Sequence, residues 1–202
     1  MPVLELRLTP GESVVAETGQ LGWLDDGVEI ETTTVAAGAD GVFDAALRSF
    51  GGGTFFMTRY ESVSRPGTVA FPARLPGKIV QVPLGPGRSH LIQRHGFLAG
   101  LGNGHAWLEL SGELSEYDLE PGQTMRVHPA NVGLVESTVT YELGLVPGIK
   151  NKLFGGDGLF LLKLTGTGKI WLQSLSLPLL ADALEPYLPN PEQASGVSLK
   201  LG

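Results

Sequence analysis

An internal repeat constrains the fold of this chain more than any other feature of the sequence. Residues 10–31 align with residues 121–142 without a gap, and a Pro-Gly pair, a later glycine (Gly22 and Gly133), a valine and a glutamate coincide. Most other aligned positions exchange similar residues. A fixed offset over a segment of this length indicates one structural unit that is used more than once. The repeat predicts a fold and an assembly, but no reaction.

The repeat continues beyond this segment. Each copy passes a short helix-prone stretch, reaches Phe-Gly-Gly, and then enters apolar strands; these stretches are Val42–Arg48 before Phe50 and Ile149–Leu153 before Phe154. A weaker middle copy opens at Pro76-Gly77, and its match requires gaps. We therefore predict one domain of three β-units, at approximately 1–72, 73–118 and 119–174, followed by a C-terminal helix and tail at 175–202.

The composition favours many short strands joined by tight turns. The 202 residues include 29 glycines and 14 prolines, while 42% of the residues are hydrophobic, so the chain can bury a core. Period-two alternation and turn residues predict an all-β sandwich or barrel. The predicted strands are 3–8, 28–33, 54–60, 68–71, 78–84, 90–94, 105–110, 124–128, 139–143, 159–164 and 169–175, and the predicted helices are 42–49 and 178–188.

The charge disfavours nucleic-acid binding. The formal net charge is −7, and basic residues form no stripe. Basic residues also fail to recur at matched hairpin positions, where Val15 aligns with Arg126 and Glu17 aligns with His128. The absence of cysteine excludes disulfides, thiolate metal sites and cysteine nucleophiles.

Nothing in the sequence resembles a targeting or membrane-spanning segment. The start, Met1–Arg7, lacks the basic and apolar regions of a signal peptide, and no apolar run approaches the roughly 18 residues of a spanning helix. We expect a soluble, cytoplasmic protein without a membrane span.

Glycine-rich runs at 51–53 and 155–158 resemble phosphate-binding loops only superficially. A phosphate cradle needs a helix N-terminus directly after the loop, whereas both runs lead into predicted strands. A turn or bulge is the simpler function for these glycines. Asp25-Asp26 is likewise typical of a hairpin turn.

The histidines are the remaining candidates for chemistry: His90, His95, His105 and His128. Metal-binding β-helix enzymes place two histidines on one strand face, together with a carboxylate. His90 and His95 are five residues apart and face opposite ways on a regular strand, whereas His105 and Glu109 share a face. Trp107 between them is typical of an ordinary half-buried strand. We predict no catalytic, cofactor-binding or metal-binding residues, and no cofactor.

The segment Leu175–Leu188 is amphipathic, and its polar side carries Asp182 and Glu185 but no basic residue. Helices that bind membrane surfaces usually carry Lys or Arg there. We expect this helix to pack on its own domain or on a neighbouring subunit. The apolar residues in 197–201 predict an added edge strand.

The run 155–174, together with the Leu-x-Pro-Gly turn at Leu119–Gly122 and the Phe-Gly-Gly motif, resembles the mitochondrial-biogenesis (altered inheritance of mitochondria) family of uncharacterised proteins. The resemblance implies a double-stranded β-helix like that of the tryptophan RNA-binding attenuation protein (TRAP-like), present three times in one chain. It further implies that three chains close a ring of nine units. The family has no established catalytic residues. The chain departs from longer members at Ser111–Tyr117, where a fuller glycine-rich run is replaced.

These observations predict an all-β fold of three fused TRAP-like units with pseudo-threefold symmetry and a short C-terminal helix. They favour a non-enzymatic scaffold or binding protein that forms a homotrimeric ring and binds an unknown protein or small molecule. The alternatives are a metal-dependent cupin-like enzyme or small-molecule binder, in which His90, His105 or His128 would gather beside a carboxylate, and an RNA-binding ring.

Overall fold

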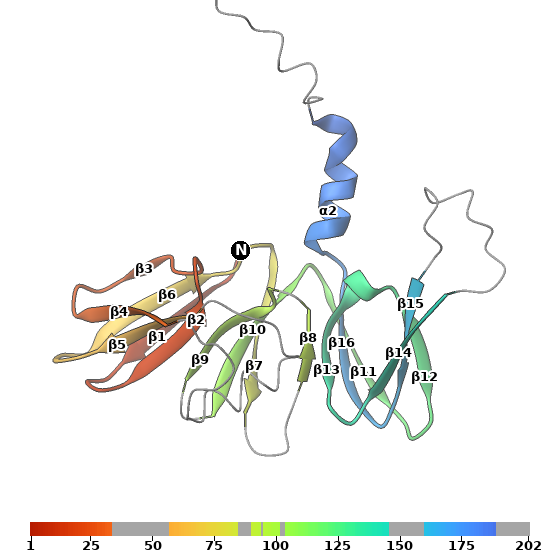
Figure 1. Cartoon of the computed structure of the whole chain (residues 1–202), viewed down its shortest axis with the longest axis horizontal. Helices are drawn as coiled ribbons and strands as arrows, with labels where there is room; N and C mark the ends of the chain where they lie inside the picture. The colour runs from red at the N-terminus through yellow and green to blue at the C-terminus, as the bar shows by residue number, and fades with distance from the viewer. Residues whose placement is uncertain (34–56, 85–89, 94, 102–103, 146–159, 189–202) are drawn as a thin grey trace, which may run out of the picture.

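A computed structural model describes residues 1–33, 57–84, 90–93, 95–101, 104–145 and 160–188 (Figure 1). Several predicted features lie outside the described residues. These are the helix at 42–49, the helix-prone stretch at 149–153, the glycine runs at 51–53 and 155–158, and the edge strand at 197–201.

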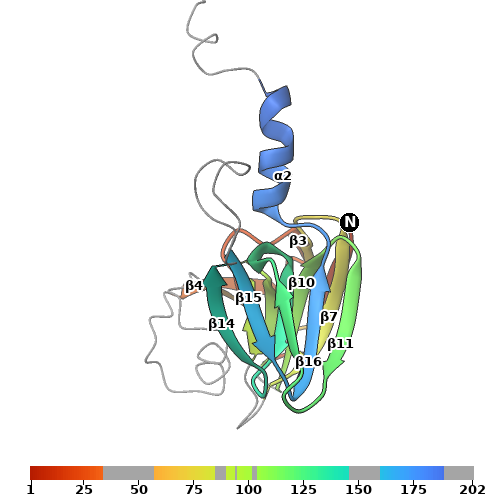
Figure 2. The same cartoon turned by 90° about the vertical axis from the view of Figure 1, so that its right-hand side faces the viewer.

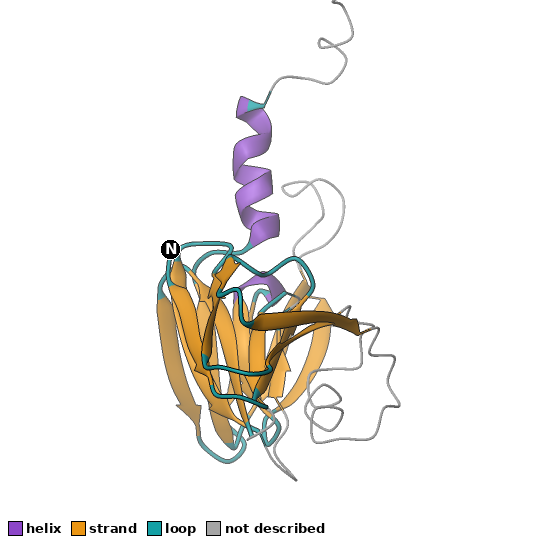
Figure 3. Cartoon of the chain, turned by 90° about the vertical axis from the view of Figure 1, so that its left-hand side faces the viewer, coloured by secondary structure: helices purple, strands orange, loops and turns teal. Residues whose placement is uncertain are grey.

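The described chain is all-β with one short α-helix, as predicted (Figure 3). The first strands are β1 (Val3–Leu8), β2 (Ser13–Glu17), β3 (Trp23–Leu24), β4 (Val28–Thr33), β5 (Met57–Ser62) and β6 (Gly67–Pro72). The middle strands are β7 (Gly77–Pro83), β8 (His90–Ile92), β9 (Phe97–Leu101) and β10 (His105–Ser111). The last elements are β11 (Leu114–Leu119), β12 (Thr124–Val127), η1 (Pro129–Asn131), β13 (Val132–Glu136), β14 (Thr140–Leu145), β15 (Phe160–Thr165), β16 (Gly168–Gln173), α2 (Leu177–Leu184) and η2 (Glu185–Tyr187).

The strands form four antiparallel sheets in the described part of the chain, and none of them closes on itself. Their orders are β1-β6-β3, β4-β5-β2-β9-β10-β7, β11-β16-β13-β8 and β12-β15-β14. The first and last regions of the chain therefore share a strand order, because β1-β6-β3 corresponds to β11-β16-β13, and β4-β5-β2 corresponds to β14-β15-β12. Of the predicted sandwich or barrel, the layered arrangement is the one observed.

Matched carboxylates hold matched turns in these two regions. Asp25 Oδ2 accepts the backbone N–H of Thr68 at 2.8 Å, and Glu136 Oε2 accepts the backbone N–H of Lys169 at 2.8 Å. Asp25 and Glu136 are aligned in the sequence repeat. The exchange of one acid for the other therefore conserves a hydrogen bond that fixes the start of β6 and of β16.

A second pair of side chains repeats in the same way. Gln20 Nε2 donates to the carbonyl of Pro72 at 2.7 Å, and Asn131 Nδ2 donates to the carbonyl of Gln173 at 2.9 Å. Each amide satisfies a backbone carbonyl at the end of the corresponding strand, β6 or β16. The sequence repeat thus extends to side-chain hydrogen bonds.

The core consists of three apolar clusters, which follow one another along the row of sheets. The first is centred on Leu8, Val14, Tyr60, Val69 and Phe71, the second on Met57, Phe97, Leu108, Leu110 and Leu134, and the third on Leu119, Val135, Val139, Leu164 and Ile170. Tyr60 and Phe71 make an edge-to-face ring contact with centroids 5.4 Å apart. The apolar side chains of the described residues are therefore buried in three clusters.

Helix α2 stands above the sheets (Figure 2). Ser176 caps it, since its Oγ accepts the N–H of Leu179 at 3.4 Å, and a proline lies in the first turn. The α-helix ends at Leu184 and continues as the 3₁₀ turn Glu185–Tyr187, which contains Pro186. A proline lacks the N–H that would extend the α-helix. None of the residues of α2 is buried within its own chain. No helix in the described part of the chain has the length and apolar content needed to cross a bilayer.

Candidate functional site

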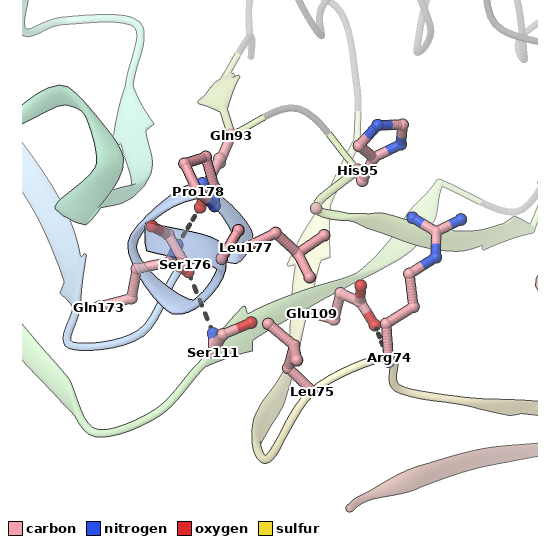
Figure 4. Close-up of a pocket in the computed structure, with 12 residues that line it drawn as sticks. Arg74, Leu75, Gln93, His95, Glu109, Ser111, Gln173, Ser176, Leu177 and Pro178 are labelled. Atoms are coloured by element: carbon pink, nitrogen blue, oxygen red, sulfur yellow. Dashed lines mark hydrogen bonds between the residues drawn. The ribbon is translucent and has the colours of Figure 1, made fainter. Parts of the chain in front are cut away.

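A cavity of about 440 Å³ is lined by residues from distant parts of the chain (Figure 4). It lies between the end of β10, the segment that follows β6, and the start of α2. The residues that line it are Arg74, Leu75, Gln93, His95, Gly96, Glu109, Ser111, Gln173, Ser176, Leu177, Pro178 and Ala181.

The alternation of β10 brings polar side chains to this cavity. Leu108 and Leu110 point into the second core cluster, and their side chains are almost completely buried. Successive side chains on a strand face opposite ways, so Glu109 and Ser111 lie on the other face and line the cavity. The apolar residues that anchor β10 therefore also fix the position of Glu109.

Glu17, at the end of β2, joins two cationic or potentially cationic side chains at the edge of the cavity. His95 Nδ1 lies 2.8 Å from Glu17 Oε1, and Arg74 Nη2 lies 3.1 Å from Glu17 Oε2. A carboxylate only accepts, so the histidine nitrogen is the donor. The Arg74 contact is an ion pair rather than a hydrogen bond, because Oε2 has no hydrogen-bond partner among the described residues. The side chain of Glu17 is only 14% exposed.

Glu109 is a second, separate carboxylate at the cavity. It is 9% exposed, and its Oε2 accepts the backbone N–H of Arg74 at 2.9 Å. Burial raises the pKa of Glu109 above its ordinary value, and the hydrogen bond and positive charge of Arg74 oppose this only in part. A carboxylate with a raised pKa can hold a proton or interact strongly with a cation.

His95 adopts an unusual backbone conformation. Its φ is 66°, in the left-handed region that residues other than glycine rarely enter. Such a conformation costs roughly 1–3 kcal/mol and persists where the surroundings enforce it. The hydrogen bond to Glu17 holds the imidazole at the mouth of the cavity, where it is 43% exposed.

Gln173 builds the opposite wall. Its Oε1 accepts the backbone N–H of Ser111 at 3.0 Å, and its Nε2 donates to Gln93 Oε1. The side chain of Gln173 therefore links β16 to β10 and to Gln93, the residue that follows β8. This wall is held by hydrogen bonds between three elements, so the cavity is a preformed feature of the fold.

The structure does not gather the histidines in the way that the metal-enzyme alternative requires. The cavity is lined by His95, while His90 lies in β8 opposite Glu136, and His128 caps η1 by accepting the N–H of Ala130 at 3.3 Å. His105 shares a face of β10 with Glu109, as predicted from their spacing, but is not among the residues lining the cavity. No group of three or more potential metal ligands occurs among the described residues.

Sequence reasoning did not predict the cluster of Glu17, Arg74, His95 and Glu109. These residues come from β2, from the segment after β6, from the turn before β9 and from β10, and no local pattern joins them. One signal was available: Glu109 stands between two leucines in a strand that is otherwise rich in apolar residues.

The described part of the chain is an all-β fold of several open sheets with one short α-helix, and a cavity with a few polar groups lies beside that helix. The chain belongs to the mitochondrial biogenesis AIM24 family, whose sequence pattern matches residues 1–103 and 100–175. The crystal structure of a protein from Streptococcus pyogenes, a structural-genomics target, is similar over 93% of this chain and 94% of that chain, with a TM-score of 0.71 and 26% sequence identity. No curated protein has a significantly similar sequence.

Proposed function

We propose that the chain is a self-associating scaffold and binding protein, in which three small β-units fused in one chain extend into a closed ring of three copies. The argument rests on how the units are joined within the chain. The pairing of β7 with β10 supports the middle unit predicted at 73–118. The strand β11 ends where the third unit, predicted at 119–174, begins, and it pairs with β16 of that unit.

Consecutive units are joined in the same way at two places, by antiparallel pairing of one strand from each unit. β3, β9 and β13 occupy equivalent places, because each lies beside the central strand of the orders β1-β6-β3, β7-β10-β9 and β11-β16-β13. β9 pairs antiparallel with β2 of the preceding region, and β13 pairs antiparallel with β8 of the preceding region. The facing residues are Ala99 with Ala16 and Gly100 with Val15 at the first junction, and Leu134 with Ile92 and Val135 with Leu91 at the second.

If every unit is joined to its neighbour by this kind of pairing, one strand of the first unit and one strand of the last unit are left without a partner unit. Within the described residues β3 pairs only with β6, and β12, the equivalent of β2, pairs only with β15. Open edges are templates for pairing with another chain. β3 is equivalent to β9, and β12 is equivalent to β2, and β9 and β2 pair with each other at the first internal junction. By analogy, β12 of one copy would pair with β3 of the next.

Trp23 is the single observation that carries this proposal. The residues at its place in the internal junctions, Ala99 and Leu134, are each 0% exposed, whereas Trp23 is 50% exposed. A large indole on an open strand edge is an unfavourable surface for an isolated chain. Pairing with β12 of another copy would cover it, as pairing with β2 covers Ala99.

The internal registers also fix the expected external register. If β3 and β12 pair in the register of β9 and β2, Trp23 lies opposite Val127 and Leu24 lies opposite Arg126. Such a head-to-tail contact forms a ring if its rotation closes and a filament if it does not. No sheet closes within the described chain, so closure depends on several copies, and the resemblance to TRAP-like rings favours three.

The test compares two lysine substitutions by light scattering coupled to size-exclusion chromatography. We expect the unmodified protein to elute at three times the mass of one chain and Trp23→Lys to elute as a monomer, because a charge on the open edge opposes strand pairing. Tyr117→Lys is the matched control: Tyr117 is 43% exposed on β11, an edge strand that takes no part in the proposed contact between β3 and β12, and this variant should remain trimeric. A monomeric unmodified protein, or a trimeric Trp23→Lys variant, contradicts the proposal.

A further inference from the structure

We propose that the cavity beside α2 binds a small organic cation, a primary amine with a hydrocarbon arm, whose ammonium group contacts Glu109. This inference goes beyond self-association and does not depend on it, since the cavity is formed within one chain.

The acceptor capacity of Glu109 is the first reason. A carboxylate has about four lone-pair sites, and the hydrogen bond that holds this one comes from the backbone N–H of Arg74 to Oε2. The guanidinium group of Arg74 lies against Glu17, 3.1 Å from Oε2. Glu109 is thus a carboxylate about nine-tenths buried at the wall of a cavity. No ion pair within 4 Å engages it among the described residues, although the positive charge of Arg74 acts on it from farther away.

The charge at the cavity is the second reason. Glu17 and Glu109 carry two negative charges and Arg74 carries one positive charge, so the group is negative overall when the His95 imidazole is neutral. The whole chain has a formal net charge of −7. The local negative charge at the cavity and the net negative charge of the chain both attract a cation and repel an anion.

The start of α2 does not provide an alternative anion site. The N–H of Leu179 is used by the Oγ of Ser176, which caps the helix. The amide of Gln173 donates to the side-chain carbonyl of Gln93. The capping N–H of Leu179 and the side-chain amide of Gln173 are therefore already engaged and are not available to a bound carboxylate or phosphate.

The remaining walls of the cavity suit a hydrocarbon group. Leu75 lies below the opening, and Leu177 projects from the start of α2 toward Glu109 (Figure 4). Pro178 and Ala181 extend this apolar side. A volume of about 440 Å³ lies within the range of small-molecule sites, which combine apolar walls with a few placed polar groups.

Ligand binding should also be coupled to the protonation of Glu109. Burial raises the pKa of this carboxyl, while a bound ammonium group favours the charged form. Amine affinity should therefore increase as the pH rises through the titration of Glu109. Glu17, Arg74 and His95 face the same region, so the profile must be compared with that of a Glu109→Gln variant, in which these three groups remain.

The test uses three probes with one skeleton and different charges: cyclohexylmethylamine, cyclohexylmethanol and cyclohexanecarboxylate. Binding to the full chain is measured by isothermal titration calorimetry at neutral pH. We expect the amine to bind about tenfold or more tightly than the alcohol, the magnitude of one charge-assisted hydrogen bond, and the carboxylate to bind more weakly still. This comparison requires no variant, so it stands even if substitutions at Glu109 impair folding.

A pair of variants then assigns the residue. Glu109→Gln keeps an acceptor for the Arg74 N–H but removes the charge, and it should weaken amine binding about tenfold or more. Glu29→Gln, a change at an exposed glutamate on β4, should leave the affinity unchanged. The proposal is overturned if the amine does not bind, if the carboxylate binds as tightly as the amine, or if Glu109→Gln leaves the amine affinity unchanged.

Discussion

Gly11 and Gly122 show why single residues of the repeat are fixed. They follow the matched prolines at the turn before β2 and before β12, and their φ angles are +83° and +78°. A Cβ atom added at either position would meet no atom within 4 Å. The requirement for glycine at these turns is therefore conformational rather than steric.

Replacement of either turn glycine by alanine should lower the free energy of unfolding by about 1 kcal/mol, because alanine enters the left-handed region at a cost. Chemical denaturation measures this change. Gly144→Ala is the control, since Gly144 also has open space around its Cβ position but has no positive φ; it should not destabilise the protein. Equal effects at Gly11 and Gly144 would show that backbone conformation is not the cause.

Gly22 and Gly133 are aligned in the same repeat for a different reason. An added Cβ would lie 2.6 Å from Pro72 Cδ at Gly22, and 2.9 Å from Leu110 Cδ2 at Gly133. These two glycines allow β3 and β13 to approach neighbouring side chains closely. The same letter in the alignment thus encodes turn geometry at one position and close packing at another.

Glu109 should make stability depend on pH. Its pKa is raised in the folded protein, so the folded state binds more protons than the unfolded state between the ordinary glutamate pKa and the raised one. Stability contributed by the protonated carboxyl is present below this window and is lost as the pH rises through it. Glu109→Gln should remove this loss.

Thermal unfolding of both proteins from pH 4 to pH 8 tests this prediction. The melting temperature of Glu109→Gln, relative to that of the unmodified protein, should rise with pH across the window. A difference that stays constant over the whole pH range would contradict the assignment of the titration to Glu109.

At the scale of elements, α2 depends on its cap more than on packing. It has eight residues, none of them buried within the chain, and isolated helices of this length are marginal in water. Ser176→Ala removes the capping oxygen and should destabilise the helix by about 1 kcal/mol. Hydrogen exchange of residues 177–184 should become faster, whereas Ser137→Ala, at an exposed turn, should leave it unchanged. Unaltered exchange in Ser176→Ala would show that contacts outside the chain hold α2.

The strand β11 shows where pattern reasoning failed at this scale. Its central residues, Ser115, Glu116, Tyr117 and Asp118, are all exposed, so the segment has no period-two apolar alternation. It becomes a strand by pairing with β16 along its whole length. No strand is predicted there, because an edge strand with two solvated faces has no hydrophobic signal.

For the whole molecule, the expected external register can be tested by cross-linking. The chain contains no cysteine, so the double variant Trp23→Cys/Val127→Cys introduces the only thiols. Directly opposed residues on antiparallel strands have Cβ atoms about 4.5–5.5 Å apart, close to the requirement of a disulfide. Oxidation should link copies head to tail.

The products separate a ring from a filament on a denaturing gel without reductant. A closed ring of three copies gives a ladder that ends at the trimer, whereas an open filament gives longer products. Either single-cysteine variant should give dimers at most. Absence of cross-linked species in the double variant would exclude this register.

Much of the fold follows from the sequence alone. The all-β class, the matched turns and the C-terminal helix were predicted, because alternation, glycine and proline positions, and capping act over a few neighbouring residues. The exchange of Asp25 for Glu136 was visible in the alignment, although its reason, a hydrogen bond to a distant backbone N–H, was not.

Only the tertiary structure decided which distant groups meet. The cavity joins residues from regions as far apart as Arg74 and Ala181, and Glu17 meets His95 across 78 positions of sequence. Such contacts are set by strand order and by the packing of the sandwiches, neither of which leaves a local pattern. That β3 and β12 each have one partner strand among the described residues was equally invisible in the sequence, because whether a strand is paired depends on its neighbours in space.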